Sequence, residues 1–413
     1  MKVKNLHLYR FRGFEDLQIS FPKDAQMLVF IGENGSGKSS LLEGMSMILR
    51  KAFSKYYNYV RVDWSNPDNV HSSHLKGNIS IELQAPKKSY TFSNEILKES
   101  SMGTGRFNRS EEYKVALPPV ILHYSVLKTT IETYKDAPPI AFNIPMTTDF
   151  EMILDWFIEQ ENDENRKRLR HDNNYRSGEL QTIREVITKA LTLLNGEKGN
   201  SFTDLQTETD ETVKDGQVSS WLSITKNGLR LNVHQLSDGE KRIIILLIDI
   251  TRRLITLAKL NKSTDYLNGA GIVLIDEIEQ HLHPKWQRTF LPTLCKIFPN
   301  LQFVATTHSP QVLSYVPNGC AFSLENGKAY PQNTFGRNNE WILEAIMDDV
   351  SRPLEVQANL DAYFDLIRED KLTEAAILRK KLEEVIGADE PELLKADILI
   401  RRKQKSMAKN EAN

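Results

Sequence analysis

The fold of this chain is decided by residues 31–40, which read Ile-Gly-Glu-Asn-Gly-Ser-Gly-Lys-Ser-Ser. The stretch matches the spacing G-x-x-x-x-G-K-[ST], with Gly32, Gly37, Lys38 and Ser39 at the specified positions. The apolar run before it predicts a buried strand, and the apolar residues after it recur at helical spacing. A glycine-rich loop between a strand and a helix can direct backbone N–H groups and the positive helix end at a phosphate. The sequence therefore predicts a nucleotide-binding phosphate loop.

The side chains of this loop have separate expected roles. Lys38 is expected to reach the β- and γ-phosphates, and the Ser39 hydroxyl is expected to bind Mg²⁺. A glycine loop before an ordinary helix is the alternative, but the strand and helix on either side favour the phosphate loop. The predicted ATP-binding residues here are Gly32, Glu33, Asn34, Gly35, Ser36, Gly37, Lys38, Ser39 and Ser40.

Composition limits the classes of protein to consider. The 413 residues are 40% hydrophobic and 26% charged, which suits a large core divided into two or three lobes. The formal net charge of -2 indicates no overall attraction to nucleic acid. The basic run at 165–171 leaves a local nucleic-acid contact as an alternative to a solvated helix face. Cys295 and Cys320 stand in no C-x-x-C motif, so neither a zinc nor a disulfide framework is expected.

The chain shows no sign of a membrane segment. No apolar run approaches the roughly 20 residues that a membrane span needs. The first five residues, Met-Lys-Val-Lys-Asn, do not begin an apolar signal-peptide core. We therefore expect a cytoplasmic protein.

A second candidate site element is the apolar run 271–275, which Asp276 and Glu277 follow directly. Ligands of open α/β sheets bind at the carboxyl ends of the strands, where these acids would lie. Asp276 is expected to complete the Mg²⁺ shell, and Glu277 to polarise the attacking water. Solvated acids at a strand end are the alternative interpretation.

Two further stretches suit contacts with phosphate. Residues 236–242, Leu-Ser-Asp-Gly-Glu-Lys-Arg, precede a buried helix or strand, and Ser237 and Gly239 suit a second phosphate contact. A simple helix N-cap would explain the same residues. The buried strand expected at 301–307 ends in His308, which could hydrogen-bond the γ-phosphate or the water. A lone histidine is more often structural, and only its position in the series favours the functional interpretation.

Taken in order, these motifs resemble the heads of ABC-type ATPases. The resemblance is strongest to the branch that contains structural-maintenance-of-chromosomes (SMC) proteins, RecF and the overcoming-lysogenisation-defect nucleases. It extends over roughly residues 1–330, but the glutamine of the Q-loop is not placed beyond the neighbourhood 117–125. The matching elements are Arg-Phe-Arg-Gly-Phe at 10–14, the signature motif at 236–242, the Walker B motif with its glutamate at 272–277, the D-loop at 278–284 and the switch histidine His308.

The resemblance implies an α/β fold: an ABC ATPase head of the P-loop NTPase class. An antiparallel β-lobe, an inserted helical lobe and a C-terminal helical region should accompany the head. The expected divisions are an N-terminal ATPase half with the phosphate loop and β-lobe at 1–146, the inserted helical lobe at 147–217, a C-terminal ATPase half at 218–334 and the helical region at 335–413.

The resemblance also implies a mechanism with ATP and Mg²⁺ as cofactors. Ser39 and Asp276 would hold the metal ion, while Glu277 and His308 would be catalytic. A homodimer, or a higher even-numbered oligomer, is implied because signature loops of this class complete the site of the opposite subunit. Ser237, Gly239 and Glu240 would thus bind ATP in trans.

The C-terminal segment narrows the resemblance. Residues 335–392 are similar to the C-terminal helices of small ATPases in bacterial antiphage defence, nearest to the ATPase subunit of Septu systems, which is also found with retrons. Related nucleases carry a C-terminal nuclease domain, whereas this segment has neither the acidic cluster nor an H-N-H pattern. The resemblance therefore implies slow ATP hydrolysis that switches or restrains a separate nuclease, of HNH type. The alternatives are a RecF-like DNA-repair ATPase that binds DNA directly, and a nucleotide sensor or scaffold without turnover.

Overall fold

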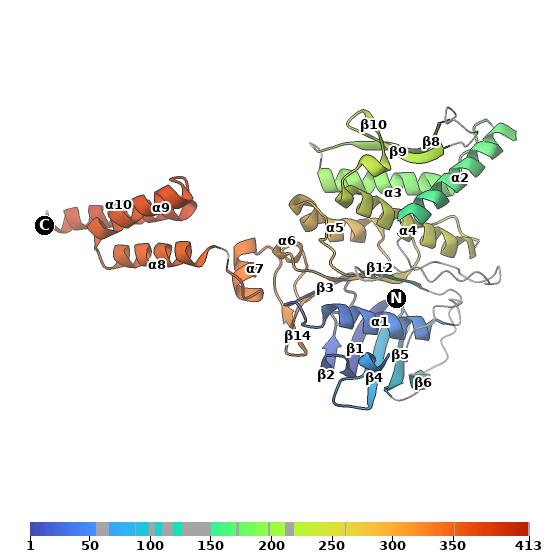
Figure 1. Ribbon diagram of the computed structural model, residues 1–413, viewed down its shortest axis with the longest axis horizontal. Helices are drawn as coiled ribbons and strands as arrows, with labels where there is room; N and C mark the ends of the chain where they lie inside the picture. Colours follow the sequence, from blue (N-terminus) through green and yellow to red (C-terminus); the bar gives the residue numbers. More distant parts are fainter. Residues whose placement is uncertain are drawn as a thin grey trace. The chain divides into compact units, whose positions relative to one another are not determined.

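The computed structural model describes residues 1–54, 66–86, 88–98, 104–109, 119–125, 150–170, 173–196, 199–210, 219–260, 262–350 and 352–411. The chain forms two compact units, Met1–Ile342 and Leu343–Asn413 (Figure 1). The expected divisions at 146 and 217 lie outside the described residues.

A six-stranded sheet is the centre of the first unit. Its strand order is β14-β13-β3-β12-β11-β7, and all strands except β14 run parallel to their neighbours. Every residue of β3, β11 and β12 is buried, because helices or a second sheet cover both faces. The strands are β3 (Met27–Ile31), β7 (Val120–Tyr124), β11 (Gly271–Ile275), β12 (Leu301–Thr306), β13 (Ala321–Glu325) and β14 (Lys328–Gln332).

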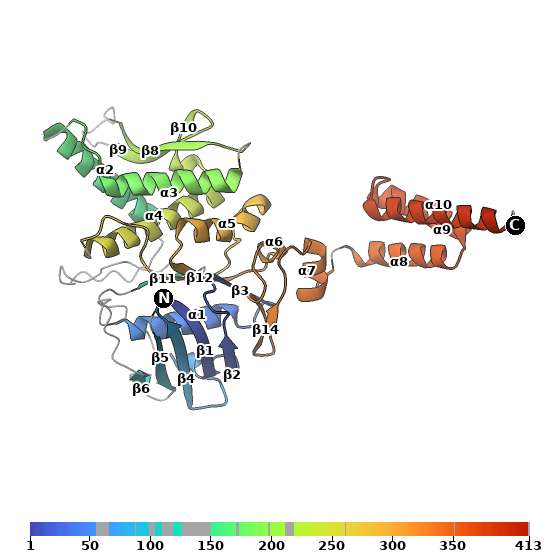
Figure 2. The ribbon, with the colours of Figure 1, turned by 180° about the vertical axis from the view of Figure 1, so that it is seen from behind.

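Helix α1 (Lys38–Ala52) lies between this sheet and the N-terminal lobe (Figure 2). The lobe is a five-stranded antiparallel sheet in the order β2-β1-β4-β5-β6, and a short turn, η1 (Pro67–Asn69), leads towards it. The predicted antiparallel lobe is therefore confirmed, with β6 as a strand that the sequence did not indicate. Its strands are β1 (Lys2–Phe11), β2 (Phe14–Ser20), β4 (Lys76–Gln84), β5 (Ser89–Leu97) and β6 (Thr104–Arg109).

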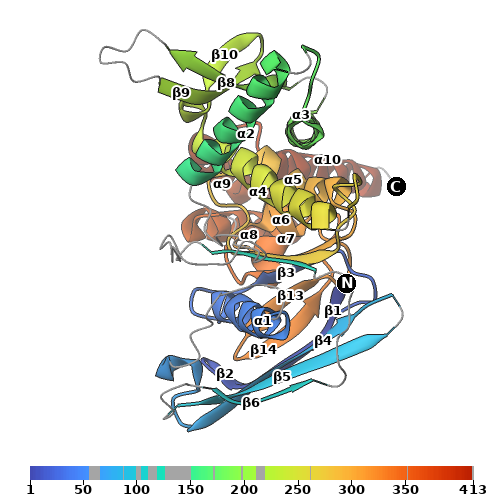
Figure 3. The ribbon, with the colours of Figure 1, turned by 90° about the vertical axis from the view of Figure 1, so that its right-hand side faces the viewer.

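The opposite face of the central sheet carries α4 and α5, and α3 packs on both of these helices (Figure 3). A three-stranded antiparallel sheet, β10-β9-β8, caps this side beyond α2 and α3. The elements are α2 (Phe150–Arg170), α3 (Gly178–Asn195), β8 (Phe202–Asp210), β9 (Ser219–Lys226), β10 (Leu229–Asn232), η2 (Val233–Gln235), α4 (Asp238–Leu260), α5 (Pro284–Ile297) and α6 (Pro310–Leu313).

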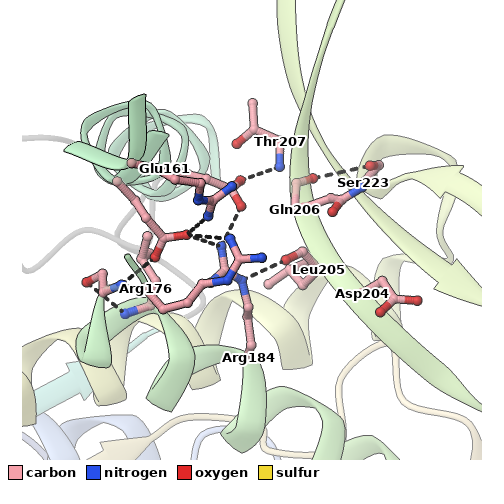
Figure 4. Close-up of polar contacts among 12 residues, drawn as sticks. Glu161, Arg176, Arg184, Asp204, Leu205, Gln206, Thr207 and Ser223 are labelled. Carbon is pink, nitrogen blue, oxygen red and sulfur yellow. Dashed lines mark hydrogen bonds and ion pairs between the residues drawn. The ribbon is translucent and has the colours of Figure 1, made fainter. Parts of the chain in front are cut away.

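Strand β8 lies inside the range 147–217 that was expected as an inserted helical lobe, and a buried ionic cluster attaches the strand to the helices (Figure 4). Glu161 on α2 accepts hydrogen bonds from Arg184 on α3 and from the backbone N–H of Thr207 on β8. Arg184 Nε also donates to the carbonyl oxygen of Leu205 at 3.1 Å. Because Glu161 is only 6% exposed, these charge-assisted bonds fix the position of the strand against both helices.

The second unit is a helical hairpin followed by a third helix: α8 (Leu354–Arg368), α9 (Leu372–Ile386) and α10 (Pro391–Glu411), after α7 (Asn339–Ile346), which spans the division. On its surface, Arg379 donates from Nε and Nη2 to the two carboxylate oxygens of Asp397, at 2.8 Å each. Among the described residues of the chain, no helix is long and apolar enough to span a bilayer. The core residues are Leu360, Tyr363, Ile367, Ala375, Leu382, Leu393 and Ala396.

Candidate nucleotide site

The phosphate loop connects β3 to α1, and two of its glycines, Gly32 and Gly37, leave no room for side chains. Gly37 is the N-cap of α1 with φ 98°, a left-handed conformation that favours glycine. A Cβ on Gly37 would lie 2.5 Å from the ring of Phe14, and one on Gly32 would lie 2.6 Å from the Ser36 hydroxyl. The backbone N–H groups at the start of α1 have no side-chain cap. The loop therefore has the form that a bound phosphate requires.

Lys38 folds back into this loop. Its Nζ atom donates to the carbonyl oxygens of Gly32 at 2.7 Å and Glu33 at 2.8 Å, and the residue is only 7% exposed. Burial lowers the pKa of its ammonium group, while the nearby carboxylates of Asp276 and Glu277 act in the opposite direction. A buried cation is thus held beside both acids of the predicted Walker B motif.

Asp276 and Glu277 follow β11 at the same sheet edge as the phosphate loop. Since β3, β12 and β11 are parallel neighbours, their carboxyl ends meet there. Thr306, at the end of β12, donates from Oγ1 to Asp276 Oδ1 at 2.5 Å and accepts from the Glu277 N–H at 2.9 Å. Asp276 is 3% exposed, whereas Ser39 is exposed. The threonine therefore orients the carboxylate that was predicted to bind the metal.

The backbone of Glu277 adopts a left-handed conformation with φ 48°, which is strained for a residue with a side chain. Arg242, on α4, donates from Nη2 to the carbonyl oxygens of Asp276 at 3.3 Å and Glu277 at 3.1 Å. Its Nη1 donates to the carbonyl of Gln280 at 2.8 Å and to the Gln280 side chain at 3.0 Å. Arg242 thus fastens the start of α4 to the turn that carries Glu277.

His308 is held by a carboxylate that the sequence analysis missed. Glu279 accepts from the His308 backbone N–H at 2.6 Å and from the Thr307 hydroxyl at 2.7 Å. This leaves the half-exposed imidazole on the loop after β12, beside the strand that leads into the phosphate loop. The sequence signal for Glu279 was its place two residues after Glu277, but only the structure shows its partners.

The predicted signature residues form a capped helix start. Ser237 donates from its hydroxyl and its N–H to Glu240 Oε2, each at 2.9 Å, and Lys226 donates to Glu240 Oε1 at 2.7 Å. Burial alone would raise the pKa of Glu240, but the hydrogen bonds from Lys226 and Ser237 outweigh it and lower that pKa. A Cβ on Gly239 would lie 2.4 Å from the carbonyl oxygen of His281, so only glycine fits against the predicted D-loop.

The signature residues face a cavity of about 880 Å³ in which the phosphate loop has no part. Ser237 itself is exposed. None of residues 32–40, all of which are described, lines this cavity. The structure thus brings Lys38 near Asp276 and Glu277, but places the signature residues around a separate hollow. The lining residues are Asn195, Gly199, Asn200, Asn227, Ser237, Gly239, Glu240, His281, Leu282, His283, Lys285 and Trp286.

The residues of the phosphate loop, together with Asp276, fit a nucleoside triphosphate with Mg²⁺. Within the described residues, the Ser36 hydroxyl is buried and has no hydrogen-bond partner, as expected of a group that a phosphate oxygen would satisfy. A hydroxyl and a carboxylate are oxygen ligands of the kind that Mg²⁺ takes alongside phosphate oxygens, and Ser39 and Asp276 would supply them.

Comparisons with known proteins agree with this chemistry. A family model described as "AAA ATPase domain" matches residues 1–168. A second, described as "AAA domain, putative AbiEii toxin, Type IV TA system", matches residues 135–314.

Two curated relatives match most of the chain. The "Retron Ec83 probable ATPase" of Escherichia coli is 28% identical over 479 residues, covering 98% of this chain and 87% of that protein. "Septu protein PtuA" of Bacillus thuringiensis is 24% identical over 392 residues, covering 90% of this chain and 92% of that protein. Among solved structures, an SMC head bound to the C-winged helix domain of ScpA has a TM-score of 0.47 at 14% identity, covering 81% of this chain and 98% of that chain.

The class of protein follows from the phosphate loop and these matches together: the chain is a P-loop ATPase. In particular, it is similar along most of its length to the probable ATPases of two retrons and to the Septu protein PtuA.

Proposed function

We propose that this ATPase hydrolyses ATP slowly at a homodimer interface and thereby restrains or switches a separate nuclease subunit in bacterial antiphage defence. The observation that carries the proposal is the match to the retron Ec83 ATPase, which covers 98% of the chain and therefore includes the second unit as well as the ATPase core. The nuclease is expected to be a separate chain of HNH type.

The proposed chemistry assigns one task to each site residue. Lys38 and the loop N–H groups bind the β- and γ-phosphates, and Ser39 and Asp276 hold Mg²⁺, which neutralises charge on the phosphates. Glu277 accepts the proton of the attacking water, and His308 donates to the γ-phosphate. Thr306 and Arg242 are positioning residues, since their hydrogen bonds go to Asp276 and to the Glu277 backbone.

The dimer is proposed because the signature residues line a cavity to which the phosphate loop of their own chain does not contribute. Ser237 is exposed at the rim of a cavity that the phosphate loop does not line. In a two-fold dimer the two chains use the same surface, so a contact of one chain's signature residues with the other chain's phosphate loop occurs twice. Each chain would then supply Ser237, Gly239 and Glu240 to the phosphate loop of the other.

A subunit-mixing experiment tests the composite site. Lys38→Ala damages the phosphate loop and Ser237→Arg damages the signature, so each variant should be inactive alone. In a mixed dimer one site carries both lesions and the other carries neither. With random exchange, about half of the dimers are mixed, and each has one intact site of two. ATP turnover should therefore recover to at most about a quarter of the wild-type rate.

The matched control mixes Lys38→Ala with Glu277→Gln. Both lesions belong to the same half of the proposed site, so every site in the mixed dimer keeps one of them and no recovery is expected. Recovery in both mixtures, or a crosslink that places Ser237 nearer to its own Lys38 than to its neighbour's, would refute the composite site.

The partner is tested by expressing the chain with the genes that adjoin it in its native genome. We expect an encoded nuclease to co-purify, and its activity on DNA or RNA to differ between complexes of wild type and Glu277→Gln. The RecF-like alternative predicts instead that the chain alone binds DNA, with an affinity that falls steeply with salt. Tight, salt-sensitive DNA binding without a co-purifying nuclease would replace the present proposal.

The ion pairs formed by the basic run 165–171 favour a separate nuclease partner over direct DNA binding by this chain. Lys167 pairs with Asp163 at 2.7 Å and Arg168 with Glu164 at 3.0 Å, so two of its positive charges are already neutralised. The match to a RecF protein of Leptospira interrogans covers only 26% of this chain.

A further inference from the structure

The N-terminal lobe gathers a carboxylate and two imidazoles outside the nucleotide site. Glu15 lies at the start of β2, and His71 and His74 lie in the loop before β4. One oxygen of Glu15 and one ring nitrogen of each histidine all lie within 4.8 Å of one another. Within the part of the chain that the structure describes, this is the one group of three or more histidine, cysteine, aspartate or glutamate side chains with that spacing.

We propose that Glu15, His71 and His74 bind a divalent transition-metal ion of the zinc type, with water as the fourth ligand. His74 Nε2 lies 3.0 Å from Glu15 Oε2, and His71 Nδ1 lies 3.7 Å from the same oxygen. In a tetrahedral centre with bonds of about 2.0 Å, ligand atoms lie about 3.3 Å apart. The two separations fall on either side of this value, so small side-chain movements complete the geometry. Two imidazoles and a carboxylate are a common zinc donor set.

The backbone holds these donors in place before any ion binds. Val70 forms an antiparallel bridge with Phe11, at the end of β1. The His71 N–H donates to the carbonyl oxygen of Arg10 at 2.9 Å, and the His74 N–H donates to the carbonyl oxygen of His71 at 2.9 Å. The loop that carries His71 and His74 is therefore hydrogen-bonded to the end of β1, and β2 with Glu15 follows directly after β1. Binding an ion thus requires little ordering of the chain.

The two oxygens of Glu15 differ in their neighbours. His74 Nε2 reaches both of them, at 2.9 Å for Oε1 and 3.0 Å for Oε2. Arg10 Nε lies 3.5 Å from Oε1, whereas His71 Nδ1 lies 3.7 Å from Oε2, so Oε2 is the oxygen placed to bind an ion together with both imidazoles. The Ser73 hydroxyl lies 2.9 Å from His71 Nδ1, and the ion takes the place of that hydrogen bond. Both histidines are half-buried, which leaves the fourth position open to water.

The same sheet contains a natural control for an ordinary ion pair. His7 on β1 and Asp16 on β2 approach to 2.8 Å, but they belong to no group of three potential ligands in the described chain. If the contact between His74 and Glu15 were only a surface ion pair of this kind, replacing His74 should leave metal binding unchanged, just as replacing His7 should.

The test is a zinc titration of the full-length chain after chelator treatment, without nucleotide and with excess Mg²⁺ to occupy hard oxygen sites. Calorimetry should show one zinc ion per chain. His71→Gln and His74→Gln should each weaken binding roughly 10- to 100-fold or more, since even outer-shell changes reach that range. Glu15→Gln, which keeps the side-chain shape, should also weaken it, and His7→Gln should leave it unchanged. Circular dichroism checks that each variant is folded.

Cobalt substitution identifies the donor atoms. Co²⁺ at this site should give the visible absorption of a four-coordinate nitrogen and oxygen centre, and His74→Gln should abolish it. Absence of zinc binding by the wild-type chain would overturn the proposal. So would equal affinity of His74→Gln and His7→Gln, or a cobalt spectrum with thiolate bands, which would assign the ion to Cys295 or Cys320.

Discussion

Replacing Arg242 with methionine tests whether the start of α4 controls the turn that carries Glu277. The two terminal nitrogens of Arg242 each bond to backbone carbonyls of that turn, the shortest contacts being 2.8 Å to Gln280 and 3.1 Å to Glu277. Methionine has a long apolar side chain, so it retains much of the packing of the arginine stem and loses these bonds.

The expected magnitude follows from those contacts. A hydrogen bond to or from a charged group contributes about 1.5–3 kcal/mol. Each terminal nitrogen makes two contacts, and we count only the shorter one of each, so that two full hydrogen bonds are lost. Removing a partly desolvated charge offsets some of that loss. We therefore expect Arg242→Met to lower the free energy of unfolding by about 2–4 kcal/mol. The strained backbone of Glu277, with φ 48°, then relaxes, and turnover should fall about 10- to 100-fold, while the KM for ATP changes little.

Urea unfolding and steady-state ATP hydrolysis measure the two effects. Arg242→Lys keeps the charge but cannot reach the same carbonyls with two nitrogens, so it should give an intermediate result. Lys241→Met is the matched control, since Lys241 pairs with Asp238 at 3.2 Å and contacts none of the carbonyls. If Arg242→Met loses less than about 0.5 kcal/mol of stability, within the range of ordinary surface changes, and turns over at the wild-type rate, the reasoning is wrong.

Three further predictions address the site and the second unit. Glu277→Gln should bind ATP normally in calorimetry but hydrolyse it about 100- to 10,000-fold more slowly, and near-normal turnover would show that Glu277 is not the base. Lys38→Ala should lose ATP affinity because the cation beside the phosphates is gone, whereas unchanged affinity would count against the phosphate loop. The hydrogen bond from Arg379 lowers the pKa of Asp397, so this pair stabilises the fold above the ordinary aspartate pKa of about 4 and the effect is lost as the pH falls through the lower, folded-state value. Asp397→Asn should therefore cost about 1 kcal/mol at pH 7 and nothing in strong acid, as measured by chemical unfolding at both pH values. An equal cost at both would contradict the assignment.

Sequence reasoning succeeded where the signal was local. The runs 27–31, 271–275 and 301–306 are largely apolar because both faces of these strands are covered, and the structure confirms all three as buried strands. The signal for the phosphate loop is local too, because the spacing of its glycines and the helix that follows are enough to predict it. The ATPase class and the α/β head with its antiparallel lobe were therefore predicted correctly.

The missed features depend on pairing between distant residues. Strand β8 is polar, and the left-handed Asp204 interrupts its pairing with β9, so its apolar residues do not alternate. The contacts of Arg242 with the Glu277 turn and of Glu279 with His308 join residues some 30 positions apart. No local pattern encodes such contacts, and they appear only when the sheet aligns the ends of its strands.

The core of the second unit has a consequence for how this protein can be altered. Its seven buried core residues, from Leu360 to Ala396, form one cluster contributed by α8, α9 and α10, and the ion pair between Arg379 and Asp397 joins α9 to α10. Natural recombination, or a designed chimera with its junction between α7 and α8, can therefore exchange the helices from α8 onward as a block while every side chain of the ATPase unit stays the same.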